Sequence, residues 1–157
     1  SILDLRLRVD AMDGASEPFS DRLARLRHRM QPALEQRGIH MLWDTCSLAS
    51  AGTIHPEGAT QLVAILQEAL SNVLQHSHAS QVVVGVQYLP DSCTWYTEIS
   101  DNGLGIRLGP GDITTASGHG IAGMRQRAHL AGGQLRVLQQ LGGGTCVWAV
   151  VPSQGQR

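Results

Sequence analysis

Lysine is absent from the sequence, and this absence excludes two common ways in which a fold binds nucleotide phosphates. All 12 residues in the combined lysine and arginine count are arginine. A P-loop places a lysine on the β- and γ-phosphates, and the protein-kinase fold needs a lysine on a central strand. Any phosphate chemistry in this chain must therefore use backbone amides, a metal ion and polar side chains.

The bulk composition is that of an ordinary folded domain. A length of 157 residues with 42% hydrophobic residues and a net charge of −1 suits a single domain with an aliphatic core. No apolar run is long enough to predict a membrane span. Cys46, Cys93 and Cys146 are widely spaced and predict neither a disulfide framework nor a zinc site, which favours a reducing cytoplasm. Because the chain begins with Ser1, we expect an N-terminal neighbour.

The periodicity of apolar residues predicts a two-layer α/β (α+β) sandwich. Helices are expected at residues 20–36, 57–76 and 119–131, and strands at 39–45, 81–88, 93–100, 135–140 and 145–151. Ser20 is the expected N-cap of the first helix. The central helix should bury Leu62, Ile65, Leu66, Ala69, Leu70 and Val73. This order of elements predicts helices packed on one face of a mixed, largely antiparallel sheet.

Polar residues recur on one side of the central helix. Glu68 and Asn72 are four residues apart, and His76 extends the row by another turn. The oxygen of an asparagine amide is a hard ligand that suits Mg²⁺ when nucleotide phosphates complete the coordination. Glu68 could orient or deprotonate a nucleophile. The alternative is that these residues are the exposed side of an amphipathic helix.

The segment DNGLG, residues 101–105, follows an expected strand. Asp101 can accept a hydrogen bond from an exocyclic amine such as that of adenine, and Gly103 and Gly105 let a flat ligand approach the backbone. A simple Asp-Asn-Gly turn is the alternative.

The segment GHGIAG, residues 118–123, formally matches the dinucleotide-binding pattern of Rossmann folds. That interpretation fails because a loop precedes the segment and no acidic residue follows Asp112 to bind a ribose. A glycine-rich helix N-terminus still suits a polyphosphate, and residues 107–117 could form a lid. The final Gly142–Thr145 segment could be only a hairpin turn.

The order of these four segments resembles one known family. The chain looks like the catalytic, ATP-binding domain of a sensor histidine kinase, with the Bergerat-type fold shared with gyrase, Hsp90 and MutL. QEALSNVLQHSHA resembles the family's N box, DNGLGI its G1 box, GHGIAGMRQRA its G2 box and GGGT its last glycine box. The match covers about residues 57–152. Residues 1–13 resemble the end of a dimerisation helix or linker, which leaves 14–157 as the catalytic domain.

The resemblance implies a role for each matching residue. Asn72 would ligate Mg²⁺, and Glu68 would be the helix carboxylate next to the γ-phosphate. The remaining roles concern the nucleotide: Asp101 would bind the adenine amine in a pocket shaped by Gly103 and Gly105, Thr145 would lie near adenine, and Gly118, His119, Gly120 and Ile121 would line the phosphates. Gln75 stands where the family usually has a basic residue, which either weakens a phosphate contact or shifts it to His76.

The resemblance also implies what the domain does and with whom. It would use ATP and Mg²⁺ to phosphorylate a histidine on its own dimerisation domain, for relay to a response regulator with a helix-turn-helix output. The full-length parent would be a homodimer, with this domain in the cytoplasm and an anchor in the bacterial inner membrane possible. No nucleic-acid partner is expected. The alternatives are a stand-alone ATPase or serine-protein kinase on the same fold, and a nucleotide-sensing module without catalysis.

Overall fold

The computed structural model describes residues 17–45, 53–104 and 118–154. They form three helices and five strands. The helices are α2 (Phe19–Gln36), α3 (Pro56–His76) and α4 (Gly118–Leu130), and the strands are β1 (His40–Asp44), β2 (Gln81–Leu89), β3 (Thr94–Asp101), β4 (Gln134–Gln139) and β5 (Thr145–Pro152). The expected helix at the start of the chain and the expected lid lie outside the described residues.

The strands form one mixed sheet in the order β1-β2-β3-β5-β4. β1 and β2 are parallel, whereas the β2–β3, β3–β5 and β4–β5 pairs are antiparallel. The central strands β3 and β5 are paired so that Ser100 lies opposite Cys146. Asp101, the last residue of β3, and Thr145, the first residue of β5, therefore lie at the same end of the two strands. Residues far apart in the sequence therefore meet at one end of the central strands.

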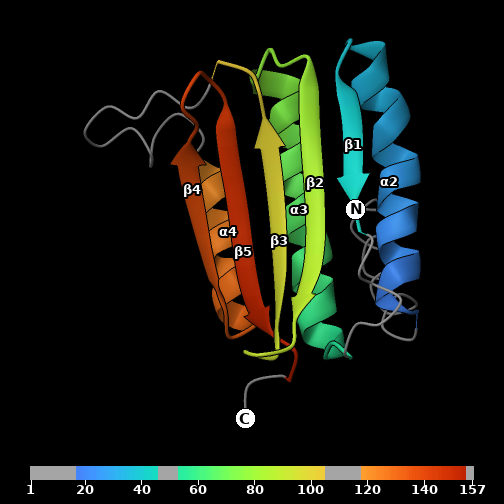
Figure 1. The fold of residues 1–157 in the computed structure, drawn as a ribbon, viewed down its shortest axis with the longest axis vertical. Helices are drawn as coiled ribbons and strands as arrows, with labels where there is room; N and C mark the ends of the chain where they lie inside the picture. Colours follow the sequence, from blue (N-terminus) through green and yellow to red (C-terminus); the bar gives the residue numbers. More distant parts are fainter. Residues whose placement is uncertain (1–16, 46–52, 105–117, 155–157) are drawn as a thin grey trace, which may run out of the picture.

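The helices cover one face of this sheet, with α3 behind β2 and β3, α4 behind β4 and β5, and α2 beside β1 (Figure 1). All six residues expected on the buried side of the central helix are buried, between 0% and 5% exposed. The sheet contributes alternate residues to the same core, among them Val82, Val84, Trp95, Ile99 and Ala149. The predicted two-layer fold, with helices on one face of a largely antiparallel sheet, is confirmed.

The predicted element boundaries differ from the observed ones by at most one residue at each end. One specific prediction is wrong: Ser20 is not the N-cap of α2, because the helix already begins at Phe19 and follows Pro18, with no side-chain cap hydrogen bond. Pro18 supplies the extended backbone that precedes the helix, and its carbonyl oxygen accepts from the amides of Asp21 and Arg22 at 3.1 Å. The cap of α3 is His55, whose Nδ1 accepts from the amide of Glu57 at 3.2 Å.

The second face of the sheet carries a polar cluster around Glu98. Its carboxylate accepts hydrogen bonds from Tyr96, Ser100 and the thiol of Cys146, at 3.1, 3.1 and 3.3 Å. Burial raises the pKa of the Cys146 thiol to about 11, so this thiol stays protonated and unreactive at neutral pH. Among the helices of the described residues, none combines the length and apolar character needed to cross a membrane.

Candidate functional site

A cavity lies between α3, the first turns of α4 and the ends of β3 and β5. Apolar side chains form most of its wall, and its polar side chains come from three separate segments. The lining residues are Ala69, Asn72, Val73, His76, Ser77, Ile99, Asp101, Ile121, Met124, Thr145 and Val147. An apolar cavity with a few convergent polar groups is the usual form of a small-molecule site.

Asp101 is the buried acidic group of this cavity. The whole Asp101 residue is only 7% exposed to solvent. Burial raises the pKa of the Asp101 carboxyl above its ordinary value, and hydrogen bonds from the backbone amides of Gly103 and Thr145 partly oppose this rise. The Gly103 amide donates to Oδ1 at 2.9 Å. The carboxylate is therefore held in place by backbone donors while it faces an apolar space.

The turn after Asp101 is fastened to the end of α3 and the start of β2. Asn102 Oδ1 accepts from the amides of Ser80 and Gln81 at 3.0 and 2.9 Å, and Asn102 Nδ2 donates to Ser80 Oγ at 2.9 Å. The chain then passes so close to Ser77 that a Cβ at Gly103 would lie 2.0 Å from the Ser77 carbonyl oxygen. Only glycine fits there, so Gly103 shapes the cavity through backbone proximity.

The β4–β5 hairpin closes the other side of Asp101. Gly142, Gly143 and Gly144 have φ values of +88°, +109° and +101°, and a Cβ at Gly144 would lie 1.9 Å from the Asp101 carbonyl oxygen. Gln140 Nε2 donates to that same oxygen at 3.0 Å and to the carbonyl of Thr145 at 3.3 Å. The glycines thus form a hairpin turn, and the turn also fits against the backbone of the site.

The beginning of α4 meets the polar row of α3. A Cβ at Gly120 would lie 3.0 Å from Glu68 Oε1, 3.2 Å from Asn72 Nδ2 and 3.6 Å from Asn72 Oδ1. Asn72 lines the cavity, whereas Glu68 is exposed and lies on the outer side of the same helix. The first turn of α4, with its free backbone amides, therefore lies beside both polar side chains.

The structure brings most of the predicted site residues together. His76 and Thr145 line the cavity, as does Ile121, which is 2% exposed. Gly118 and His119 belong to the first turn of α4. Gly105 falls outside the described residues, and Gln75 is exposed and does not line the cavity.

Sequence reasoning missed further residues of the site. Ser77, Ile99, Met124 and Val147 line the cavity, and Gln140 ties the hairpin to Asp101. Met124 follows Ile121 by three residues, so the helical spacing of these two apolar side chains could have identified it. No local pattern distinguishes Gln140 from its neighbour Gln139, because its role depends on the pairing of distant strands.

In the described part of the chain, no three histidine, cysteine, aspartate or glutamate side chains lie close enough together to hold a metal ion. Hard oxygen donors do occur beside Gly120, in the amide of Asn72 and the carboxylate of Glu68. This set fits an ion that takes most of its ligands from phosphates and water, as Mg²⁺ does.

Comparison with known proteins identifies the family of the chain and several of its relatives. The family model described as "Histidine kinase-, DNA gyrase B-, and HSP90-like ATPase" matches residues 57–155. The chain is 33% identical over 115 residues to the oxygen sensor histidine kinase NreB of Staphylococcus carnosus (strain TM300), covering 73% of this chain and 31% of NreB. It is 38% identical over 120 residues to the sensor histidine kinase LiaS of Bacillus subtilis (strain 168), covering 75% of this chain and 30% of LiaS.

A solved structure gives the same fold. Full-length ShkA in complex with AMPPNP superposes with a TM-score of 0.66 at 22% identity, covering 87% of this chain and 30% of ShkA. The chain thus spans less than one third of the length of NreB, LiaS and ShkA. The family model covers more than half of the chain and includes every described segment of the site. The chain therefore belongs to the family of histidine kinase-, DNA gyrase B- and HSP90-like ATPases.

Proposed function

We propose that this chain is the ATP-binding catalytic domain of a sensor histidine kinase. The observation that carries the proposal is the juxtaposition of two features around α3. A buried carboxylate, Asp101, faces an apolar cavity at one side, and Gly120 brings the first turn of α4 beside Asn72 and Glu68 at the other. The kinship with NreB and LiaS supports the same function.

The adenine end of the site would use Asp101 as its hydrogen-bond acceptor. The carboxylate is placed to accept from the exocyclic amine, while Ile99, Met124 and Val147 offer apolar contacts to the ring. Guanine carries a carbonyl where adenine carries the amine, so a carboxylate acceptor would reject it. Gly103 and the β4–β5 hairpin would keep Asp101 in position.

The phosphate end would use the start of α4. Backbone amides of Gly118, His119 and Gly120 belong to a helix N-terminus, which favours anions. His76 lines the cavity and could donate to a phosphate in place of the basic residue that Gln75 replaces. Asn72 would hold Mg²⁺ through its amide oxygen, and the ion would neutralise phosphate charge when bound.

Glu68 would act on the accepting histidine rather than on the nucleotide. It is exposed on α3 and lies next to Gly120, so a side chain approaching from solvent can reach it. From that position its carboxylate would accept the proton on the far ring nitrogen of the histidine and orient the imidazole for attack. Positioning and neutralisation of charge would supply most of the acceleration.

Titration of the chain with a non-hydrolysable ATP analogue, with and without Mg²⁺, tests the site. We expect binding that strengthens with Mg²⁺, is weakened by Asp101→Asn and is not reproduced by the GTP analogue. Absence of binding, or binding indifferent to Asp101→Asn, would overturn the proposal.

A phosphotransfer assay with the full-length parent tests the reaction. We expect phosphohistidine that depends on Glu68, followed by transfer to a response regulator. Release of phosphate without phosphohistidine would favour a stand-alone ATPase, and phosphoserine a serine-protein kinase. Nucleotide binding with no reaction would favour a nucleotide sensor.

A further inference from the structure

A groove of about 420 Å³ follows the solvent side of α3, between α2 and α4. Its charged lining residues are Arg22, Arg25 and Arg29 of α2, Glu68 of α3 and Arg127 of α4. Four guanidinium groups against the carboxylate of Glu68 and that of Glu17, which pairs with Arg25, give the groove a charge of +2, in a chain whose formal net charge is −1. The positive charge is therefore concentrated on this side of the helical layer.

Neutral partners hold three of the arginines in the groove. Each donates a hydrogen bond to an uncharged side-chain oxygen on α3: Arg22 to Thr60 at 3.1 Å, Arg29 to Gln67 at 2.9 Å and Arg127 to Gln61 at 3.3 Å. These contacts fix the direction of each guanidinium without neutralising it. A guanidinium retains further donors after one hydrogen bond, so each can still bind an anion.

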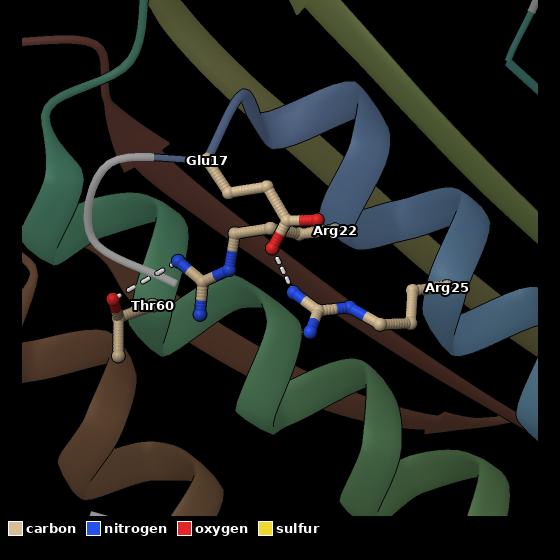
Figure 2. A network of polar contacts seen from close by, with 4 residues as sticks. All are labelled: Glu17, Arg22, Arg25 and Thr60. Carbon is tan, nitrogen blue, oxygen red and sulfur yellow. Dashed lines mark hydrogen bonds and ion pairs between the residues drawn. The ribbon is translucent and has the colours of Figure 1, made fainter. Parts of the chain in front are cut away.

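The fourth arginine shows which chemistry the groove accepts. Arg25 forms an ion pair with the carboxylate of Glu17, just before α2, while Arg22 reaches Thr60 beside it (Figure 2). Burial lowers the pKa of Arg22, so its charge has lost part of its hydration. A carboxylate is thus already bound at one end of the groove, next to a partly dehydrated guanidinium with a neutral partner.

The groove leads to the reactive end of the proposed site. Thr60 and Glu68 both line it, and eight residues of α-helix span roughly 12 Å. Asn72 lies one turn beyond Glu68 and lines the nucleotide cavity instead. A segment lying in the groove would therefore end beside Glu68, where a phosphoryl group would leave the site.

We propose that this groove binds an acidic helical segment of the domain that receives the phosphoryl group, with carboxylates of that segment on Arg22, Arg29 and Arg127, and in place of Glu17 on Arg25, whose ion pair is exposed. This inference rests on the proposed kinase function, because the receiving domain gives the groove its partner. The carboxylate of Glu68 within the groove disfavours a polyphosphate backbone, whereas a polypeptide can place a neutral or basic residue opposite it. The segment would align the accepting histidine with Glu68.

Binding of a labelled peptide tests the groove directly. The probe is a helical peptide of about 20 residues, roughly 30 Å long, with glutamates spaced four apart and a glutamine version as its control. Fluorescence anisotropy at low salt should show binding of the glutamate peptide that weakens as salt is added. In the chain with Arg25→Glu and Arg29→Glu, we expect the dissociation constant to rise about tenfold or more.

Arg27→Glu is the matched control. Arg27 lies on the same helix and is exposed, but it lines a different surface with His28 and Trp43. Its reversal changes the net charge equally per site and should change the dissociation constant by less than about twofold. The neutral variant Arg29→Gln should give an intermediate loss, and it serves as the second test if the doubly reversed variant does not fold.

Three further results decide the inference. The variants should bind the ATP analogue as the unaltered chain does, because the groove residues lie outside the nucleotide cavity. Failure of the unaltered chain to bind the analogue would count against the proposed function and not against the groove. In the full-length parent, Arg25→Glu with Arg29→Glu should lower phosphohistidine formation, whereas Arg27→Glu should not. Equal peptide binding by all variants, or tighter binding of a DNA duplex than of the glutamate peptide, would overturn the proposal.

Discussion

Gly120 of α4 lies against Glu68 of α3, so closely that a Cβ atom at position 120 would be 3.0 Å from Glu68 Oε1. The same Cβ would be 3.2 Å from Asn72 Nδ2. The helix that begins at the glycine-rich segment therefore reaches the polar row of the central helix only because this position has no side chain. The proposed metal ligand and the proposed catalytic carboxylate are both adjacent to it.

Gly120→Ala should weaken Mg²⁺-dependent binding of an ATP analogue by about tenfold, since the methyl group displaces Glu68 or Asn72 by a few tenths of an ångström. Calorimetric titration measures this effect. Gly123→Ala is the control, because it lies in the same helix with no atom within 4 Å of its would-be Cβ. That variant should bind normally and gain about 0.5–1 kcal/mol of stability. Equal nucleotide affinity in both variants would contradict the expectation.

Asp101→Asn should preserve or raise stability while it weakens nucleotide binding. The folded state raises the pKa of Asp101, so it favours the protonated form. The stabilisation linked to this group is complete below its unfolded pKa, about 3.9, and is lost as pH rises through the folded value. At neutral pH the charged carboxylate therefore costs stability, which the amide avoids. Thermal unfolding at pH 7 should show an unchanged or higher Tm, and a large fall would refute this account.

Nucleotide affinity should fall on acidification. In the proposed site, adenine's amine would require the ionised Asp101, and the raised pKa of this carboxyl places the loss at a higher pH than for an exposed aspartate. Titrations between about pH 4 and pH 7 measure the effect. In Asp101→Asn the residual affinity should lack this acid limb, so persistence of the limb in that variant would assign the titration to another group.

Gly144→Ala should destabilise the domain much more than Gly142→Ala. Both residues have positive φ, +101° and +88°, so both substitutions strain the backbone by about 1–2 kcal/mol. Only at Gly144 would the new Cβ also meet the Asp101 carbonyl oxygen, at 1.9 Å, whereas Gly142 has open space. Urea unfolding should show a loss of about 3 kcal/mol or more for Gly144→Ala. Equal losses would mean that φ strain alone explains the glycines.

Asn102→Ala should loosen the turn that carries Gly103. The substitution removes the acceptor of the Ser80 and Gln81 amides and the donor to Ser80 Oγ. We expect a loss of about 1–3 kcal/mol in urea unfolding. Asn102→Asp keeps the acceptor for both amides and loses the donor, so it should cost less. An equal loss in both variants would show that the amide donor, which both lack, is the dominant contact.

The sequence was sufficient to predict the order of the elements and the buried side of the central helix. Leu62, Leu66 and Val73 follow helical spacing, and a repeat of this kind reports burial without knowledge of the partner. In β2 alternate residues are buried, as expected for a sheet covered on one face. The start of α2 could not be predicted, because Ser20 is a favourable cap wherever it stands and only the backbone shows that Pro18 precedes the helix.

The tertiary structure alone decided which glycines the site depends on and where the charge lies. The sequence contains 18 glycines, and only the packed backbone distinguishes them. A Cβ atom added at Gly103 or Gly144 would collide with a carbonyl oxygen, whereas one added at Gly123 or Gly142 would meet no neighbouring segment within 4 Å. The arginine groove could not be predicted from the sequence for the same reason. Arg25 and Arg127 are far apart along the chain, and they line one groove only because α2 and α4 both pack beside α3. Local periodicity records which residues leave water, whereas close approach and summed charge depend on distances between segments that the chain order does not contain.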